Sequence, residues 1–251
     1  MDTQELYNLS PALRMMGMGL VLALGPLAWV WLRNRNQPAS RRLRVLTLLT
    51  LFLTFDLVLF GAFTRLTDSG LGCPDWPGCY GHASPLGATQ PITAAQEAMP
   101  TGPVTHSKAW IEMIHRYLAT GVGVLILTLT VFTWLERRKG RAVPKGSGDP
   151  GAALSLWWPM ATLIWVCIQG AFGALTVTMK LFPLIVTLHL LGGLILLALL
   201  QAQAVRYAQA HDAARPVLLP QGVWRLLALT FVLLWLQIAL GGWVKIGRAH
   251  V

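Results

Sequence analysis

The chain alternates between long apolar runs and short polar linkers. Six of the apolar runs contain about 20 residues each, the length that an α-helix needs to cross the hydrocarbon core of a bilayer. No segment shows the alternation over about ten residues that is typical of membrane β-barrels, and helices satisfy their own backbone hydrogen bonds. The pattern therefore predicts an all-α integral membrane protein with six transmembrane helices, over Leu13–Leu32, Val45–Phe63, Ile111–Leu135, Trp157–Val177, Leu184–Val205 and Val223–Val244.

The composition agrees with a membrane protein. Of the 251 residues, 55% are hydrophobic and 12% are charged, and the mean hydropathy is +0.56. These values exclude a soluble domain of this size. A net charge of +10 is also found in nucleic-acid-binding proteins, but here the basic residues lie in short runs between the apolar segments, as topology signals do. We therefore expect membrane lipid, and no nucleic acid, as a partner.

Three linkers concentrate the basic residues on one side of the predicted bundle. The linker 33–44 has five arginines and no acidic residue, the linker 136–151 has five basic residues, and the linker 206–221 has fewer. The positive-inside rule makes this side cytoplasmic. The N-terminus, the long loop 64–110 and the turn 178–183 then lie outside, and the expected location is a bacterial inner membrane.

Charged side chains flank a histidine near the outer end of the third predicted helix. Glu112 and His115 are three residues apart and share a helix face, and Arg116 follows them. Ionisable side chains at membrane depth are costly and usually face the bundle interior, where they serve a function. A structural interpretation also remains open, in which Glu112 and Arg116 reach the interface while His115 bonds a neighbouring helix.

A second histidine lies at a similar depth. His189 is six residues into the fifth predicted helix after Pro183, about 9 Å below its outer end at 1.5 Å per residue. Two histidines on different helices in one leaflet suit the axial positions of a haem iron, whereas zinc needs three or four ligands. The pattern favours haem iron bound by His115 and His189, against the alternative of two unrelated core histidines.

Three cations lie near the predicted outer boundary: Arg65, Arg116 and Lys180. Arginine holds a carboxylate in a bidentate fork, so Arg65 and Arg116 are candidate ligands of haem propionates. The alternative is an ordinary interfacial side chain, an interpretation that suits Lys180 best.

The outer loop contains two cysteines that are close in sequence. Cys73 and Cys79 are joined through prolines and a glycine in an oxidising compartment, which favours a structural disulfide. A redox-active pair is the alternative. Cys167 is in the middle of the fourth predicted helix, and we expect it to be an inert side chain packed in the core. His82 and His106 are expected to be solvated loop residues, and the alternative is that either approaches the histidine pair from above.

Short segments of small residues recur along the chain. Leu59–Thr64 ends the second run, Gln169–Ala174 lies in the fourth, and Ala239–Val244 ends the sixth. They are either devices for close helix packing or traces of a duplicated fold whose second copy begins at the sixth run.

Together these segments resemble the haem A synthase family of cytochrome oxidase assembly, over roughly residues 43 to 244. The resemblance implies two similar four-helix halves, each with a histidine pair, and oxidation of the C8 methyl of haem O to a formyl group through hydroxylated intermediates. The N-terminal half would take the substrate haem, and the C-terminal half would hold a haem B cofactor. The segments that carry the resemblance are Gly61–Gly70 with Cys73 and Cys79, Glu112–Arg116, Leu175–Thr178 and Val186–His189.

Residue roles follow from the same resemblance. His115 and His189 match the first histidine pair, Glu112 matches the acidic residue that activity needs, and Cys73 and Cys79 match the outer cysteine pair. The implied partners are haem O, haem O synthase, cytochrome oxidase and an electron partner of unknown identity.

The chain departs from the family pattern at both ends. We expect an extra helix and basic linker over 1–42, the haem-binding half over 43–208, and the start of a second half over 209–245. The residues 246–251 resemble a translated sequencing adapter and are expected to be an artefactual tail, so His250 is not a candidate ligand. The missing second half predicts that this chain is inactive alone.

Two other functions remain open at this stage. A di-histidine b-type cytochrome would transfer electrons and keep its haem unmodified. A non-enzymatic protein of oxidase assembly or transport would bind no haem.

Overall fold

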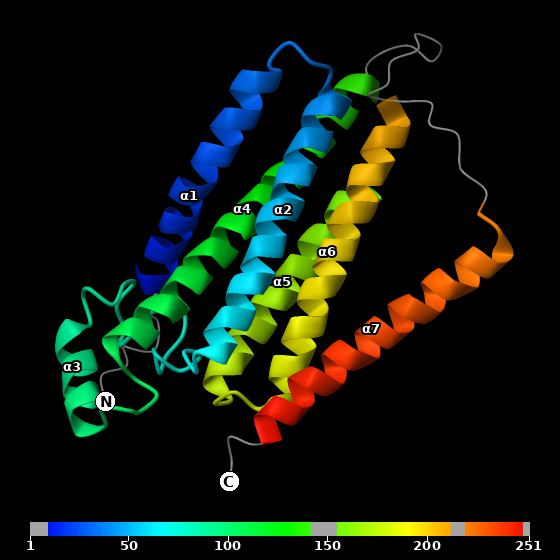
Figure 1. Cartoon of the computed structure of the whole chain (residues 1–251). Helices are drawn as coiled ribbons and strands as arrows, with labels where there is room; N and C mark the ends of the chain where they lie inside the picture. The colour runs from blue at the N-terminus through cyan, green and yellow to red at the C-terminus, as the bar shows by residue number, and fades with distance from the viewer. Residues whose placement is uncertain (1–9, 142–154, 212–218, 248–251) are drawn as a thin grey trace.

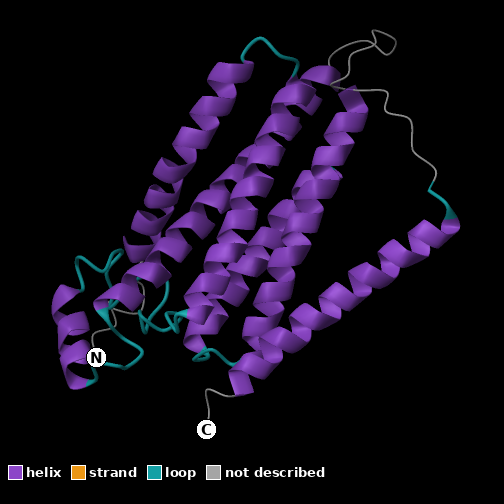
Figure 2. Cartoon of the chain, viewed as in Figure 1, coloured by secondary structure: helices purple, strands orange, loops and turns teal. Residues whose placement is uncertain are grey.

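The computed structural model describes residues 10–141, 155–211 and 219–247, which form seven helices (Figure 1). Figure 2 shows long helices joined by loops and no strand in this part of the chain. The helices are α1 Ser10–Asn34, α2 Ala39–Leu66, α3 Thr89–Ala98, α4 His106–Arg141, α5 Trp157–Thr178, α6 Pro183–His211 and α7 Gln221–Gly247.

All helices except α3 are long and apolar enough to cross a membrane. They confirm the six predicted transmembrane segments, and most extend a few residues further into the polar flanks. Prolines mark three of the starts, because proline lacks the N–H that the first turn leaves unpaired: Pro38 precedes α2, Pro183 begins α6 and Pro220 precedes α7. The short helix α3, in the outer loop, was not predicted. Parts of the two later basic linkers, 142–154 and 212–218, and the tail 248–251 lie outside the described residues.

Four helices form the central bundle. Contacts join α2 to α4, α4 to α5, α5 to α6, and α6 back to α2. This order makes a ring in which α4 and α6 are diagonal partners, and so are α2 and α5. Helix α1 packs on α4 and α2, while α7 contacts α6 at one end and diverges from the bundle (Figure 1).

Small and polar side chains hold the bundle together. Gly19 of α1 meets the side chain of Thr120 on α4 so closely that a methyl group would clash, which is the packing expected where lipid removes the hydrophobic drive between helices. A buried chain of hydrogen bonds also joins three helices: the Tyr207 hydroxyl meets Thr133 Oγ1 at 2.7 Å and Gln203 Nε2 at 3.3 Å, and Gln203 Oε1 accepts from Thr162 Oγ1 at 3.2 Å. These contacts fix the α4–α5–α6 register away from the outer loop.

Candidate functional site

The two intramembrane histidines project from diagonal helices of the ring. His115 is on α4 and His189 is on α6, two helices that lie diagonally across the ring. Two side chains on diagonal helices of a four-helix bundle approach its interior from opposite sides. This arrangement is the one that a planar group bound on both faces requires.

Each histidine lies beside a glycine of the next helix in the ring. A methyl group built on Gly61 of α2 would lie 3.0 Å from Cε1 of His115, and one built on Gly173 of α5 would lie 3.4 Å from Cε1 of His189. Both glycines are five residues from the outer ends of their helices, about 7.5 Å at 1.5 Å per residue. The two imidazoles therefore lie beside glycines that are equally far from the outer ends of their helices.

The glycines also explain part of the small-residue repeats. Gly61 and Gly173 occupy equivalent places beside the two imidazole rings. Neither of the two interpretations of the repeats, close helix packing or a duplicated fold, predicted this role. A side chain at either position would fill the space next to an imidazole.

Both rings carry a nitrogen without a partner. Within the described residues, Nδ1 of His115 and Nδ1 of His189 are buried and make no hydrogen bond. A buried polar atom left unpaired costs about 1–3 kcal/mol, so two at one level need an explanation. The Phe60 ring stacks on His115 at 6.2 Å between centroids and 10° between planes, which leaves the imidazole held by apolar contact. The residues present fit a haem bound through its iron.

Above His115, a buried carboxylate of α4 pairs with Arg116 of the same helix and accepts a hydrogen bond from the outer loop. Glu112 Oε1 accepts from Arg116 Nη2 at 2.5 Å, and Glu112 Oε2 accepts from the backbone N–H of Cys73 at 2.8 Å. Both carboxylate oxygens are thus engaged. Glu112 shares a helix face with His115, so one turn of α4 carries both the histidine and the attachment of the loop.

Arg116 holds the same loop from below. Its Nη1 donates to the carbonyl oxygens of Asp75, Pro77 and Gly78 at 3.0, 3.3 and 2.6 Å. Glu112 accepts from Nη2, so both terminal nitrogens of the guanidinium already bond to groups of the protein. The sequence had suggested a propionate ligand or an interfacial side chain, and it contained no signal of this loop contact because the partners are backbone carbonyls.

The other cations lie at the outer helix ends. Arg65 is in the last turn of α2, half-buried and near Asp68. Lys180 is exposed in the turn between α5 and α6. Among Arg65, Arg116 and Lys180, Arg65 has the position and the available guanidinium that the propionate prediction needs.

The outer loop is compact. Cys73 and Cys79 form a disulfide, and the Asp75 carboxylate accepts from the backbone N–H groups of Tyr80 and Gly81 at 2.6 and 2.7 Å. The Tyr117 hydroxyl of α4 donates to the carbonyl of Ala83 at 2.6 Å. These contacts fix the loop over the outer end of α4.

The remaining candidates lie away from the histidine pair. His82 is exposed, and His106 begins α4 and pairs with Thr93 of α3 at 2.8 Å. Cys167 is exposed on α5 rather than in the core, because the mid-span surface there faces outward. Within the described residues, no group of three or more His, Cys, Asp or Glu side chains lies close enough to hold a metal ion.

Comparison with known proteins identifies the family of the chain. The model of the cytochrome oxidase assembly protein family matches residues 44–251. The chain belongs to this family. The match begins in α2 and leaves α1 outside it.

Relatives of this family member are named haem A synthase. One from Shewanella oneidensis is 39% identical over 197 residues, covering 78% of this chain and 55% of its own length. Two others, from Rhizobium etli and Rhizobium meliloti, are 36% and 33% identical and cover 42% of this chain each. The chain spans about half the length of the Shewanella relative and a third of the other two. No solved structure matches it.

Proposed function

We propose that this chain binds the substrate haem of a membrane oxidoreductase that makes haem A. His115 and His189 would hold the iron, and the enzyme would oxidise the C8 methyl of haem O to a formyl group through hydroxylated intermediates, with the removed electrons passing to the separate electron partner. The observation that carries the proposal is the pair of imidazoles at one depth on diagonal helices, each with a buried nitrogen that lacks a partner. The relatives named haem A synthase support the same reaction.

The surrounding residues orient this substrate. Gly61 and Gly173 leave room beside the imidazoles, and Arg65 binds a propionate at the outer surface, so the propionates point toward the outer loop. The disulfide loop, held down by Glu112 and Arg116, covers the outer opening and limits the access of water.

Glu112 is the residue that we propose to handle protons during methyl oxidation. It is a buried carboxylate one turn from an iron-binding histidine, and a carboxylate placed there accepts or donates a proton beside the macrocycle. Its bonds to Arg116 and Cys73 hold it in one orientation. Glu112 is therefore both the anchor of the loop and the candidate proton carrier.

The wider setting is part of the same proposal. We place the N-terminus and the cysteine loop outside a bacterial inner membrane, and we expect haem O synthase and cytochrome oxidase as partners. A haem B cofactor would need a second histidine pair at membrane depth, and the described residues contain one such pair, so we propose that this chain supplies the substrate half of the enzyme.

The haem recovered from the protein tests the reaction. In cells that make haem O, we expect a chain extended with the second half of a relative to yield hydroxymethyl or formyl porphyrin, measured by extraction and mass spectrometry. The chain alone should retain unmodified haem O. If the extended protein keeps an unmodified haem B with a two-histidine spectrum, it is a b-type cytochrome, and if it shows no Soret band, it is a non-enzymatic assembly or transport protein.

The glycines beside the rings provide a second test. We expect Gly61→Val and Gly173→Val to weaken haem binding by about tenfold or more, because an overpacked site costs about 1–3 kcal/mol. Gly170→Val is the matched control on α5, since a methyl group at Gly170 meets no atom within 4 Å. Titration of the apoprotein with haem, followed at the Soret band, measures all three. Equal affinities would show that haem binding does not need the space beside the imidazoles.

The proposed orientation can be tested through the outer loop. On intact spheroplasts, Leu86→Cys should react with a membrane-impermeant maleimide, because Leu86 is exposed in this loop, whereas Cys73 and Cys79 are buried and joined in a disulfide. The cytoplasmic control, Lys139→Cys, should react only after lysis, since Lys139 is exposed near the opposite end of α4. Labelling of Lys139→Cys before lysis, with Leu86→Cys protected, would reverse the topology.

A further inference from the structure

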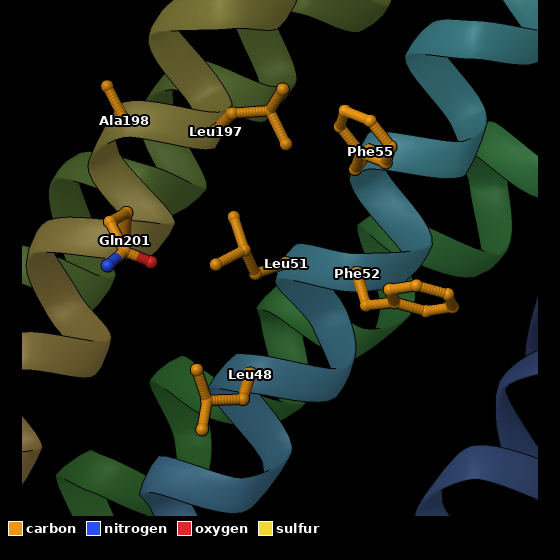
Figure 3. Close-up of a pocket in the computed structure, with 7 residues that line it drawn as sticks. All are labelled: Leu48, Leu51, Phe52, Phe55, Leu197, Ala198 and Gln201. Carbon is orange, nitrogen blue, oxygen red and sulfur yellow. The ribbon is translucent and has the colours of Figure 1, made fainter.

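An apolar groove follows the seam between α2 and α6 on the outward surface of the bundle. Figure 3 shows side chains of the two helices facing each other across it. The groove has a volume of about 480 Å³ and is open to the surface, since Leu48, Phe52 and Phe55 of its lining are exposed. It is lined by Leu48, Leu51, Phe52 and Phe55 of α2 and by Leu197, Ala198 and Gln201 of α6.

The groove lies on the same two helices as the candidate haem site, further from the outer loop. On α6, Leu197 and Gln201 follow His189 by eight and twelve residues, which places them about 12 and 18 Å along the helix. On α2, Phe55 precedes Gly61 by six residues, about 9 Å. The groove thus begins where a haem bound at the histidines would end.

One small residue of α6 lies on the seam between the groove and the candidate haem site. Gly193 of α6 faces Val58 of α2, and a methyl group there would lie 3.4 Å from a Val58 methyl carbon, in ordinary van der Waals contact. Because Gly193 has no side chain, the α2–α6 seam is shallow at this level. A flexible chain attached to the macrocycle can pass over it.

We propose that this groove binds the long isoprenoid tail that distinguishes haem O from haem B. The inference rests on the proposed function, because it requires haem O at the histidine pair. With the propionates held at Arg65, the opposite side of the macrocycle points away from the outer loop, toward the groove. The branched leucines and two phenylalanines of the lining offer an uneven apolar surface suited to a methyl-branched chain.

The expected gain in affinity is modest. Lipid and detergent tails are as apolar as the groove, so the haem tail gains close packing rather than transfer out of water, and we expect haem O to bind about tenfold more tightly than haem B. The groove therefore acts chiefly in substrate selection.

Variants that fill the groove test the assignment. Ala198→Trp should lower the affinity for haem O to that for haem B and leave haem B binding unchanged, measured by Soret titration of the full chain in nanodiscs. Gln201→Trp, at the far end, should have the same effect to a smaller extent. Ala28→Trp is the matched control, because Ala28 is an exposed alanine of α1, a helix that does not form the groove.

Three results would overturn the inference. The wild-type chain could bind haem O and haem B equally, Ala198→Trp could retain the preference, or it could weaken both haems alike. Each of these results would mean that lipid or a second copy of the chain covers the groove. None of them would contradict haem binding by the histidine pair. Absence of a two-histidine spectrum with either haem would instead overturn the proposed function.

A direct measurement avoids dependence on variants. A haem O analogue with a diazirine near the end of its tail should label peptides that contain residues 48–55 or 197–201 on illumination. Labelling confined to lipid, or to other helices, would contradict the placement.

Discussion

His115→Ala and His189→Ala are each expected to abolish the two-histidine haem spectrum and to weaken haem binding by more than about 100-fold. Loss of a group that only supports a metal ligand already costs about 10–100-fold, and these substitutions remove the ligand itself. In a chain extended with the second half, haem A formation should fall below detection. Soret titration measures the affinity, and mass spectrometry of extracted haem measures the product.

Two further variants make this result specific. His82→Ala removes an exposed loop histidine and should bind haem like the wild-type chain. His189→Gly should regain haem binding when free imidazole is added, since imidazole can occupy the space of the lost side chain. A His189→Ala protein that forms haem A at the wild-type rate would disprove the assignment of the site.

Arg116→Met is expected to cause the largest loss of stability among the outer-loop variants. It leaves the Glu112 carboxylate buried without its partner and removes the donor to three loop carbonyls. Breaking a buried ion pair from one side costs about 3–5 kcal/mol, which corresponds to a fall of roughly 10 °C in the midpoint of thermal unfolding. Unfolding of the purified protein in detergent measures this midpoint.

The partner residue and an exposed ion pair supply the controls. Glu112→Gln should be milder, because Arg116 keeps its three carbonyls, and the double variant should be less destabilised than the sum of the two single variants. Lys139→Met breaks an exposed ion pair with Glu136 and should change the free energy of unfolding by about 0.5 kcal/mol or less. If Arg116→Met matches Lys139→Met, the loop does not depend on the guanidinium.

The sequence by itself determined the membrane spans and marked two histidines as candidates. A run such as Val45–Phe63 is apolar over the thickness of the bilayer, and only a helix closes its backbone hydrogen bonds there. His115 and His189 stand out because an ionisable side chain is rare at that depth. These properties are local, so they can be read along one segment at a time.

The tertiary structure decided which helices face each other, and with them the shape of the site. The diagonal placement of α4 and α6, the glycine beside each imidazole and the groove between α2 and α6 depend on how the helices rotate and pack. Arg116 is the clearest case: its sequence position suits an interfacial cation, yet it donates to loop carbonyls that begin 41 residues away. Contacts between segments distant in the chain leave no periodic pattern in the sequence, since each partner is a backbone group or a small residue with many other roles.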